Sequence, residues 1–442
     1  MEYKKYKLGD ICKIFGRIGF RGYTTEDLVS SPSNGAISLS PSNIVDGIMD
    51  LSKCTYISWE KYEESPEIKI APNDIVLVKT GNSYGRTAII RNVEHPMTLN
   101  PQFVVLKDIQ INPVYLAYFL KTDEFQKQIY GIVGGSAIPT LSQENLANLI
   151  IRVPNDNIPN TIADILDSLD GKIELNKQIN DNLEAMAKQL YDYWFVQFDF
   201  PNEEGKPYKS SGGAMVWNEK LKREIPSCFE VVNMGNLCDF RNGINYSKDE
   251  TGNDYQIVNV RNISSSRILL DGEDFDVITV PTSKAENYVL KPDDIIIARS
   301  GCPGSTRLLL SPANTLFCGF IICCSPNDSS MRNYLVYCLK QLEGTNATTS
   351  GGSILQNVSQ DTLKGLHVIV PQKQIIDKFN KTIELIFARM LNCLKESKAL
   401  TKQRDELLPL LMNGQATINY HLSAFTGFTK RLQIHAFTIK SS

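Results

Sequence analysis

The feature of this sequence that most constrains its fold is a long internal duplication. The stretch 72–81, Pro-Asn-Asp-Ile-Val-Leu-Val-Lys-Thr-Gly, is matched by 292–301, Pro-Asp-Asp-Ile-Ile-Ile-Ala-Arg-Ser-Gly, at an offset of 220 residues (292 minus 72). Three further matches keep the same order along the chain: 7–12 with 233–238, 134–136 with 351–353, and 153–154 with 370–371. This period is about half the chain, far longer than the ~20–50 residues of solenoid repeats. The sequence therefore predicts two copies of one globular unit.

A long helical pattern follows each copy. Apolar and small residues recur at steps of four and three from Ile162 to Trp194, and again from Ile376 to Leu411. This heptad spacing predicts two helices of roughly 33 residues, about 50 Å long at ~1.5 Å per residue. Because each apolar seam needs a partner, we expect the two helices to pair antiparallel as a spacer. The alternative is that each helix packs only on its own globular unit.

Two polar residues interrupt the first of these seams. Asn176 and Asn180 occupy seam positions in the middle of the helix. Buried polar residues at such positions fix the register of a helix pair at some cost in stability. We therefore expect both asparagines to lie between the helices.

These patterns predict a mixed α/β (α+β) fold, with two duplicated globular domains separated by two long antiparallel coiled-coil helices. Short apolar β-type runs and one helix-like stretch recur in each globular copy, which fits mixed units of about 150 residues. The predicted segments are domain 1 (1–158), helix 1 (159–200), a polar Gly-, Pro- and Ser-rich linker (201–214), domain 2 (215–371), helix 2 (372–414) and a C-terminal tail (415–442).

Composition narrows the possible function classes. The chain of 442 residues is 42% hydrophobic and 21% charged, which is typical of water-soluble globular proteins. It has no apolar run near the ~20 residues of a membrane span and no signal-peptide core, so we expect a cytoplasmic protein without membrane contact. Ten cysteines form no C-x-x-C pair, which favours buried or incidental thiols and no metal site. A net charge of −3 means that any nucleic acid must be bound by local patches.

Known catalytic motifs are missing from the sequence. The stretch 292–306 looks like a phosphate-binding loop, but Gly301 and Gly304 are too close together, and Ser305 stands where a P-loop needs lysine. Methyltransferase strings of the type F-x-G-x-G or N-P-P-[FYW] are also missing. We therefore expect a non-catalytic chain with no cofactor and no metal.

One enzymatic alternative stays open. Asp50 with Glu67 and Lys69 resembles the arrangement of many metal-dependent nucleases, whose carboxylates hold Mg²⁺. The second copy has Asn287 at the position of Glu67, so this feature is not shared by the duplication. A solvated cluster of charges at a strand edge is the competing interpretation.

The polar residues that recur between the copies fall on turns. Lys79 and Arg299 end matching strands, and glycines follow both, which lets the backbone come close to a ligand. Arg or Lys with Ser, Thr and Asn is the set of side chains that contacts DNA phosphates and base edges. A capped turn with a surface ion pair is the alternative. The predicted DNA-binding residues are Arg17, Arg21, Lys79, Thr80, Asn82, Ser83, Tyr84, Arg86, Ser136, Arg241, Asn242, Asn245, Arg261, Arg299, Ser300, Ser305, Thr306, Arg307 and Ser353.

With these features the chain resembles the specificity subunit of type I restriction–modification systems. The resemblance extends to about Gln415, after which the chain departs from the family. The stretches that carry it are Leu-Gly-Asp-Ile at 8–11, the Pro-x-Asp-Ile core of both copies, Ile-Leu-Asp-Ser-Leu-Asp-Gly-Lys-Ile-Glu-Leu-Asn at 165–176, Tyr-Trp-Phe at 193–195, Pro-Tyr-Lys-Ser-Ser-Gly-Gly at 207–213 and Leu-Leu-Pro-Leu-Leu-Met-Asn-Gly-Gln at 407–415.

The resemblance implies a DNA-reading role without catalysis in this chain. It implies two target recognition domains, each contacting one half of a split double-stranded DNA sequence. It also implies partners: two modification subunits that methylate adenine, and restriction subunits held through the complex. Because the two copies share a framework but differ in their polar loops, we expect an asymmetric, bipartite target. A coiled-coil scaffold without DNA contact is a further alternative.

Overall fold

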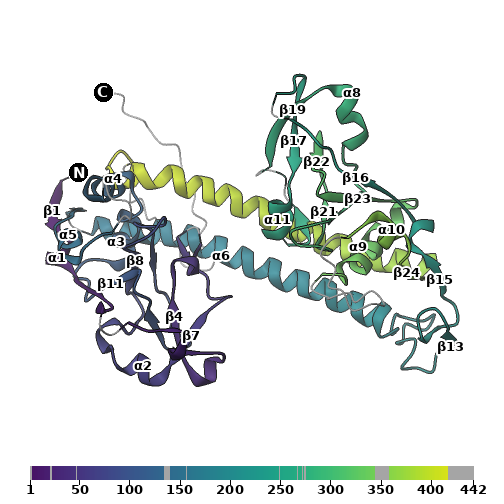
Figure 1. Ribbon diagram of the computed structural model, residues 1–442, viewed down its shortest axis with the longest axis horizontal. Helices are drawn as coiled ribbons and strands as arrows, with labels where there is room; N and C mark the ends of the chain where they lie inside the picture. Colours follow the sequence, from purple (N-terminus) through teal and green to yellow (C-terminus); the bar gives the residue numbers. More distant parts are fainter. Residues whose placement is uncertain are drawn as a thin grey trace, which may run out of the picture. The chain divides into compact units, whose positions relative to one another are not determined.

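The computed structural model describes residues 2–19, 22–45, 47–133, 140–155, 157–247, 249–265, 267–270, 272, 275–343 and 358–416. The chain divides into two compact units, Met1–Lys172 with Leu400–Ser442, and Ile173–Ala399 (Figure 1). Each unit holds one globular domain and part of each long helix, α6 (Ile158–Tyr191) and α11 (Lys373–Met412). The predicted mixed fold with duplicated domains and two long helices is confirmed.

The first domain is built on two four-stranded sheets. One has the antiparallel order β2-β11-β8-β9, and the other the order β10-β4-β7-β3. The strands are β2 (Lys13–Gly16), β3 (Leu28–Val29), β4 (Gly35–Leu39), β7 (Thr55–Ser58), β8 (Ile75–Val78), β9 (Thr87–Ile89), β10 (Met97–Leu99) and β11 (Phe103–Lys107), with a small ribbon of β5 (Ile44–Val45) and β6 (Ile48–Met49). A further pair, β1 (Tyr3–Lys7) with β12 (Ile150–Pro154), joins the start of the domain to its end.

Strand β8 shows why the apolar runs form central strands. Its sequence Ile-Val-Leu-Val is buried on both faces. Ile75 and Leu77 pack in the core beside the helices, whereas Val76 and Val78 pack in the core between the two sheets. A strand covered on both sides needs apolar residues at every position, which explains the continuous run in the sequence.

The first domain also contains five short helices among the residues described. They are α1 (Leu8–Ile11), α2 (Trp59–Glu63), α3 (Pro113–Phe119), α4 (Asp123–Val133) and α5 (Gln143–Ala147). Asn112 starts α3, because its Oδ1 accepts from the backbone N–H of Val114 at 2.9 Å and of Tyr115 at 3.1 Å, and proline takes the first helical position. The Tyr115 hydroxyl donates to the carbonyl of Arg152 at 2.7 Å, which ties α3 to β12.

The second domain repeats this topology. Its sheets have the orders β16-β23-β20-β21-β18 and β19-β17-β22, and β15 pairs with β24 as β1 pairs with β12. The parallel pair β4 with β10 is matched by β17 with β22. The strands are β15 (Glu230–Asn233), β16 (Cys238–Asn242), β17 (Asn253–Val258), β18 (Leu269–Leu270), β19 (Asp276–Val280), β20 (Ile295–Ala298), β21 (Thr306–Leu309), β22 (Thr315–Phe317), β23 (Ile321–Pro326) and β24 (His367–Val370). The duplication therefore extends to the order and direction of the shared strands, whereas β18 has no counterpart in the matching sheet of the first domain and β3 has none in that of the second.

Short helices also occur in the second domain, and at least one of them matches a helix of the first. They are α7 (Val260–Ser265), α8 (Thr282–Ala285), α9 (Arg332–Lys340) and α10 (Gln360–Lys364). The hydroxyl of Tyr334 on α9 donates to the carbonyl of Ile369 at 2.5 Å, as Tyr115 does to Arg152 in the first domain. Before this domain, the linker leads into a hairpin of β13 (Met215–Asn218) and β14 (Arg223–Pro226).

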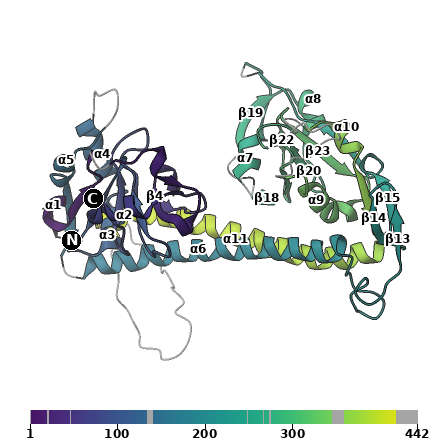
Figure 2. The ribbon, with the colours of Figure 1, turned by 60° about the horizontal axis from the view of Figure 1, so that its bottom comes forward.

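Helices α6 and α11 lie side by side and run antiparallel, as Figure 2 shows. In the first unit Asp170 pairs with Arg404 at 2.8 Å. In the second unit the Asn176 amide donates to Glu396 at 2.9 Å. The partner numbers fall as the α6 numbers rise, so the antiparallel pair is confirmed, and the alternative of helices that pack only on their own units is wrong.

The seam between these helices contains the two predicted asparagines. Asn176 is 1% exposed and Asn180 is 2% exposed. Apolar contacts surround them within each unit: Ile162 and Leu166 share a core cluster with Leu407 and Leu411, and Ala187 and Tyr191 share one with Phe379, Ile383 and Met390. After Tyr191 a π-helical turn, Asp192–Val196, ends α6. None of the described helices is long and apolar enough to cross a membrane.

Candidate nucleic-acid interface

The duplicated cations lie at equivalent ends of central strands. Lys79 follows β8 and donates its backbone N–H to the carbonyl of Gln102 at 2.8 Å. Arg299 follows β20 and donates in the same way to Phe320 at 2.9 Å. Both cations are therefore held by the same backbone contact across the sheet, and this framework repeats between the domains.

The backbone carbonyl groups of Lys79 and Arg299 also accept equivalent hydrogen bonds. That of Lys79 accepts from the N–H of Leu141 at 2.8 Å, and that of Arg299 accepts from the N–H of Val358 at 3.0 Å. Leu141 and Val358 each come shortly after the Gly-Gly-Ser segments of the duplication. Ser136 and Ser353 in these segments lie outside the described residues, as does Arg21.

The two cations differ in exposure. Arg299 is exposed, and its side chain forms no ion pair with another residue that the structure describes. Lys79 is half-buried, and burial lowers the pKa of its ammonium group. A cation at a strand end without a carboxylate beside it suits a phosphate or a base edge better than a structural ion pair.

A glycine-bounded hairpin follows each cation. Gly81 and Gly85 have φ of 90° and 83°, and Gly301 and Gly304 have φ of 80° and 84°. These left-handed conformations favour glycine over any residue with a side chain. The hairpins close through Gly85 N–H to Val78 O at 2.8 Å and Gly304 N–H to Ala298 O at 2.9 Å, so the first is one residue longer.

The predicted residues on these hairpins differ in accessibility. Asn82 and Arg86 are exposed, and five are partly buried: Thr80, Ser83, Tyr84, Ser300 and Ser305. The Thr80 hydroxyl lies 2.8 Å from that of Thr140, and the Tyr84 and Tyr130 rings are in T-shaped contact. The hairpins thus present a mixed polar surface beside Lys79 and Arg299.

The prediction that Arg17 contacts DNA is wrong. The side chain is 5% exposed, its Nε donates to the carbonyl of Leu99 at 2.9 Å, and a terminal nitrogen donates to Thr98 Oγ1 at 3.2 Å. Arg17 therefore joins β2 to the other sheet of the domain. Its partners are about 80 residues away in the sequence, so its glycine-rich surroundings could not show this role.

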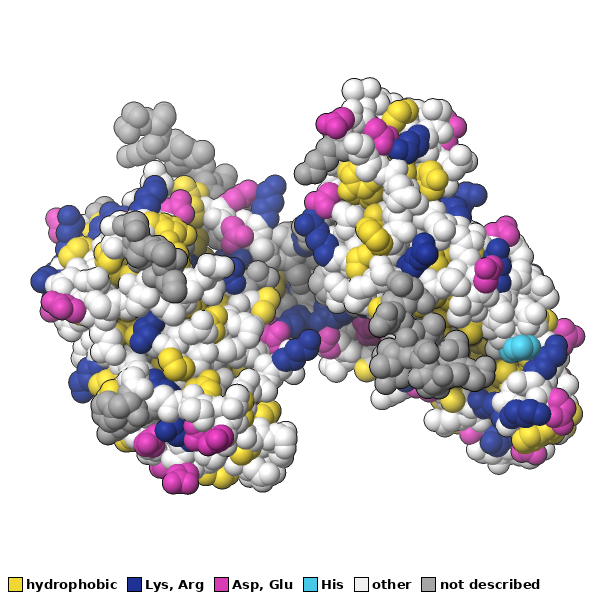
Figure 3. Space-filling view, viewed as in Figure 1, with side chains coloured by type: hydrophobic (Ala, Val, Ile, Leu, Met, Phe, Trp, Pro, Cys, Tyr) yellow, Lys and Arg dark blue, Asp and Glu magenta, His cyan; other side chains and the backbone are white. Residues whose placement is uncertain are grey.

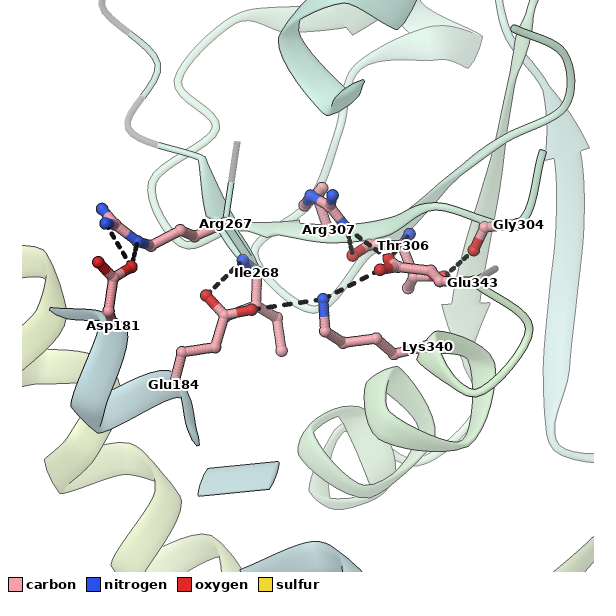
Figure 4. A network of polar contacts seen from close by, with 9 residues as sticks. All are labelled: Asp181, Glu184, Arg267, Ile268, Gly304, Thr306, Arg307, Lys340 and Glu343. Carbon is pink, nitrogen blue, oxygen red and sulfur yellow. Dashed lines mark hydrogen bonds and ion pairs between the residues drawn. The ribbon is translucent and has the colours of Figure 1, made fainter. Parts of the chain in front are cut away.

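The structure also corrects the prediction for Thr306 and Arg307, which are 0% and 6% exposed. The N–H of Thr306 donates to Glu343 Oε1 at 2.6 Å, and Arg307 forms an ion pair with the same carboxylate (Figure 4). Lys340 lies between Glu343, at 3.2 Å, and Glu184 of α6, at 3.4 Å. These residues anchor the strand after the hairpin to α6 and are too buried to reach DNA.

A second contact strengthens this anchor to α6. Arg267 Nε donates to Asp181 Oδ1 at 2.6 Å, and the backbone N–H of Ile268 donates to Glu184 Oε2 at 3.3 Å (Figure 4). All of these residues belong to the second unit. In the first unit Arg91 of the globular domain pairs with Asp167 of α6.

Arg241 forms an ion pair with Asp294, the counterpart of Asp74 in the first domain. It lies 2.7 Å from Asp294, which is 4% exposed, and also donates to Ser325 Oγ at 3.1 Å. In the first domain Lys107 holds the matching Asp74 at 2.6 Å. Arg241 therefore holds a buried carboxylate, while its side chain stays 29% exposed, and its DNA contact remains a prediction.

Asp74 and Asp294 have a structural role that the sequence analysis did not predict. Each accepts the backbone N–H of the residue three positions earlier, Ala71 or Lys291, at 2.8 Å. They thereby close the turn that leads into the cation-bearing strand. The repeated Pro-x-Asp was the signal that could have revealed this role.

Arg261 lies in α7, close to the second hairpin. It forms an ion pair with Asp276, and both side chains are largely exposed. A Cβ on Gly301 would come 3.0 Å from Val260 at the start of α7, so α7 and the hairpin after Arg299 are neighbours. Asn242, the last residue of β16, and Asn245, on the loop after it, are both exposed.

The residues of the nuclease alternative do not form a metal-binding cluster. Asp50 Oδ1 accepts from the N–H of Ser52 at 2.9 Å, and Lys69 pairs with Glu63 at 2.5 Å. In the described part of the chain, no three His, Cys, Asp or Glu side chains gather as potential metal ligands.

Comparison with known proteins agrees with the duplicated fold. The family described as "Type I restriction modification DNA specificity domain" matches residues 1–185 and 226–396. The chain belongs to this family of type I specificity subunits. Its two DNA specificity domains coincide with the two copies of the duplication.

Relatives with the same description cover most of the chain. The type I restriction enzyme MjaIX specificity subunit of Methanocaldococcus jannaschii is 26% identical, with 81% of each chain covered. The HindI specificity subunit of Haemophilus influenzae is 23% identical over 94% of this chain and 99% of its own. The crystal structure of the type I S subunit from M. genitalium has a TM-score of 0.54 at 17% identity, covering 93% of this chain and 96% of that one, which shows a shared fold. Specificity subunits are non-catalytic, so the nuclease alternative is not supported.

Proposed function

We propose that this specificity subunit reads a bipartite, asymmetric DNA target, with one globular domain for each half-site. The observation that carries this proposal is the pair of duplicated strand ends. Lys79 and Arg299 are held by the same backbone contacts, whereas the side chains around them differ. One framework with two sets of polar side chains is suited to reading two different base sequences.

The charge distribution favours local contacts over a general basic surface. The chain carries a net charge of −3. On the face shown in Figure 3, Lys and Arg side chains are interspersed with Asp and Glu. DNA binding by this subunit therefore depends on a few placed cations, and neutralised phosphates make it weaken steeply as salt rises, with a slope of about −0.9 per phosphate.

We further propose that the helix pair docks two modification subunits and that restriction subunits join through that complex, in the cytoplasm. Two matching leucines support this part. Leu175 of α6 and Leu385 of α11 occupy equivalent places in the repeated Ile-Glu-Leu string, and they are 48% and 69% exposed. Exposed leucines at duplicated positions suit two copies of one partner. The subunit itself would need no cofactor.

Mapping methylated adenines in the host genome, with and without this gene, tests the proposal. We expect a split motif whose two defined parts differ in sequence and whose methylation disappears when the gene is deleted. A palindromic or continuous motif would count against one domain per half-site. A coiled-coil scaffold without DNA contact predicts, instead, that the complex binds DNA without any dependence on this subunit's cations.

A further inference from the structure

An exposed phenylalanine lies directly beside the duplicated cation of the second domain. Phe320 is 64% exposed, although it comes immediately before the fully buried start of β23. Its backbone carbonyl accepts the N–H of Arg299. Leaving a large aromatic ring in water forgoes about 1.5–3 kcal/mol of burial free energy, so folding alone does not account for this residue.

The strand register places Phe320 and Arg299 on the same face. Ala298 of β20 pairs with Ile321 of β23 in an antiparallel ladder. The next residues outward, Arg299 and Phe320, are therefore directly opposite, and opposed side chains on one face lie about 4.5–5.5 Å apart at their Cβ atoms. An exposed cation and an exposed aromatic ring thus form one small surface.

The first domain has the same pair with different chemistry. Val78 pairs with Phe103, so Lys79 stands opposite Gln102 as Arg299 stands opposite Phe320. Both copies have a positively charged side chain at this position, whereas the opposite residue changes from an amide to an aromatic ring. A residue that selects a base is expected to differ between the two domains while the backbone that holds it stays the same.

We infer that Phe320 is a specificity-determining residue of the second half-site and contacts the C5-methyl group of a thymine. This inference rests on the proposed function and names the chemistry of its recognition site. In the major groove the thymine methyl is an apolar group that a phenylalanine can contact, beside acceptors and phosphates that suit an arginine. A protein partner would be a weaker fit, because the exposed Arg299 has no ion-pair partner among the described residues and would have to be buried with the ring.

The amide of Gln102 takes the corresponding place in the first half-site. A glutamine can bond both the N6 and N7 positions of adenine. Changes at Gln102 therefore act on the first half-site and leave the thymine contact of Phe320 unaffected.

The test uses the subunit assembled with its modification subunits and duplexes that carry its mapped target. Each thymine of the second half-site is replaced in turn by deoxyuridine, which lacks only the C5-methyl group. We expect one position at which the affinity of the wild-type complex falls about three- to fivefold, the equivalent of one buried methyl group. Phe320→Ala should abolish this sensitivity to deoxyuridine, and Gln102→Ala should preserve it.

Val277→Ala provides a matched control, because Val277 is 63% exposed in the same domain and is not next to Arg299 in the ladder. It should keep the wild-type response. The inference is overturned if Phe320→Ala keeps the deoxyuridine sensitivity, if the second half-site requires no thymine, or if the variant weakens binding equally for all sequences. If the wild-type complex showed no base preference in the second half-site, the proposed function itself would be refuted. Failure of the Phe320 inference and failure of the proposed function can therefore be told apart.

Discussion

Loss of the Glu343 carboxylate should weaken the contacts that link the strand after the second hairpin to Lys340 and, through Lys340, to Glu184 of α6. Its carboxylate accepts from the N–H of Thr306 at 2.6 Å, forms an ion pair with Arg307 and lies 3.2 Å from Lys340. Glu343→Gln keeps the shape and an acceptor oxygen for Thr306. It removes the charge that compensates Arg307, whose side chain is 8% exposed.

The structure sets the size of this effect. Breaking a buried ion pair costs about 3–5 kcal/mol, because a buried charge loses its counter-ion. The Glu343 side chain is 23% exposed and the glutamine can still accept one hydrogen bond, so we expect about 2–3 kcal/mol. For a unit of this size that free energy lowers Tm by about 4–12 °C. Recognition of the second half-site should loosen as well, since the strand after the hairpin loses its anchor.

Urea unfolding and thermal melting measure this loss, with Glu219→Gln as the matched control. Glu219 pairs with Lys222 at 2.8 Å, but both side chains are more than 70% exposed. Such a pair contributes about 0–1 kcal/mol, so the control should stay close to wild type. Equal stability of the two variants would refute the reasoning that burial of Arg307 makes the Glu343 charge important.

Three further predictions concern the helix pair, the second hairpin and a buried thiol of the first domain. Ile383→Ala, in the buried seam of α11, should destabilise the second unit by about 2–5 kcal/mol in urea unfolding. Leu385→Ala, at an exposed position, should cost at most about 0.5 kcal/mol of stability and should instead weaken binding of modification subunits. The reverse pattern would contradict the seam assignment. Cognate DNA should slow the reaction of Cys302 with a thiol reagent in the assembled complex but not that of Cys228, which is also partly buried; equal rates with and without DNA would place the hairpin away from DNA. In the same assay at pH 8 Cys12 should stay unmodified, because burial raises its pKa to about 12 and only the thiolate reacts.

The sequence predicted the framework of this protein better than its polar contacts. Periodicity identified the helix seam because apolar spacing follows directly from helix geometry, and both seam asparagines are buried as expected. The duplication located Lys79 and Arg299 at equivalent strand ends. Both features are local in sequence or are repeated, so the chain itself displays them.

The errors have a common physical cause. Arg17 and Arg307 looked like DNA contacts because each stands near glycines and hydroxyl residues, but their partners are Leu99 and Glu343, many residues away. Which cations form contacts inside the fold depends on tertiary packing, which local composition does not encode. Phe320 was missed for the same reason, since only the strand register brings it opposite Arg299.

The most direct test of one domain per half-site is a selection of bound sequences from a random duplex library with the assembled complex. Wild type, Lys79→Ala and Arg299→Ala are compared position by position. We predict that Lys79→Ala relaxes base preference, or lowers affinity, at one half of the motif only, and that Arg299→Ala does so at the other half only. For a base contact each effect should be about 1–3 kcal/mol. If both variants altered the same half, or each altered both halves equally, the assignment of one half-site to each domain would be contradicted.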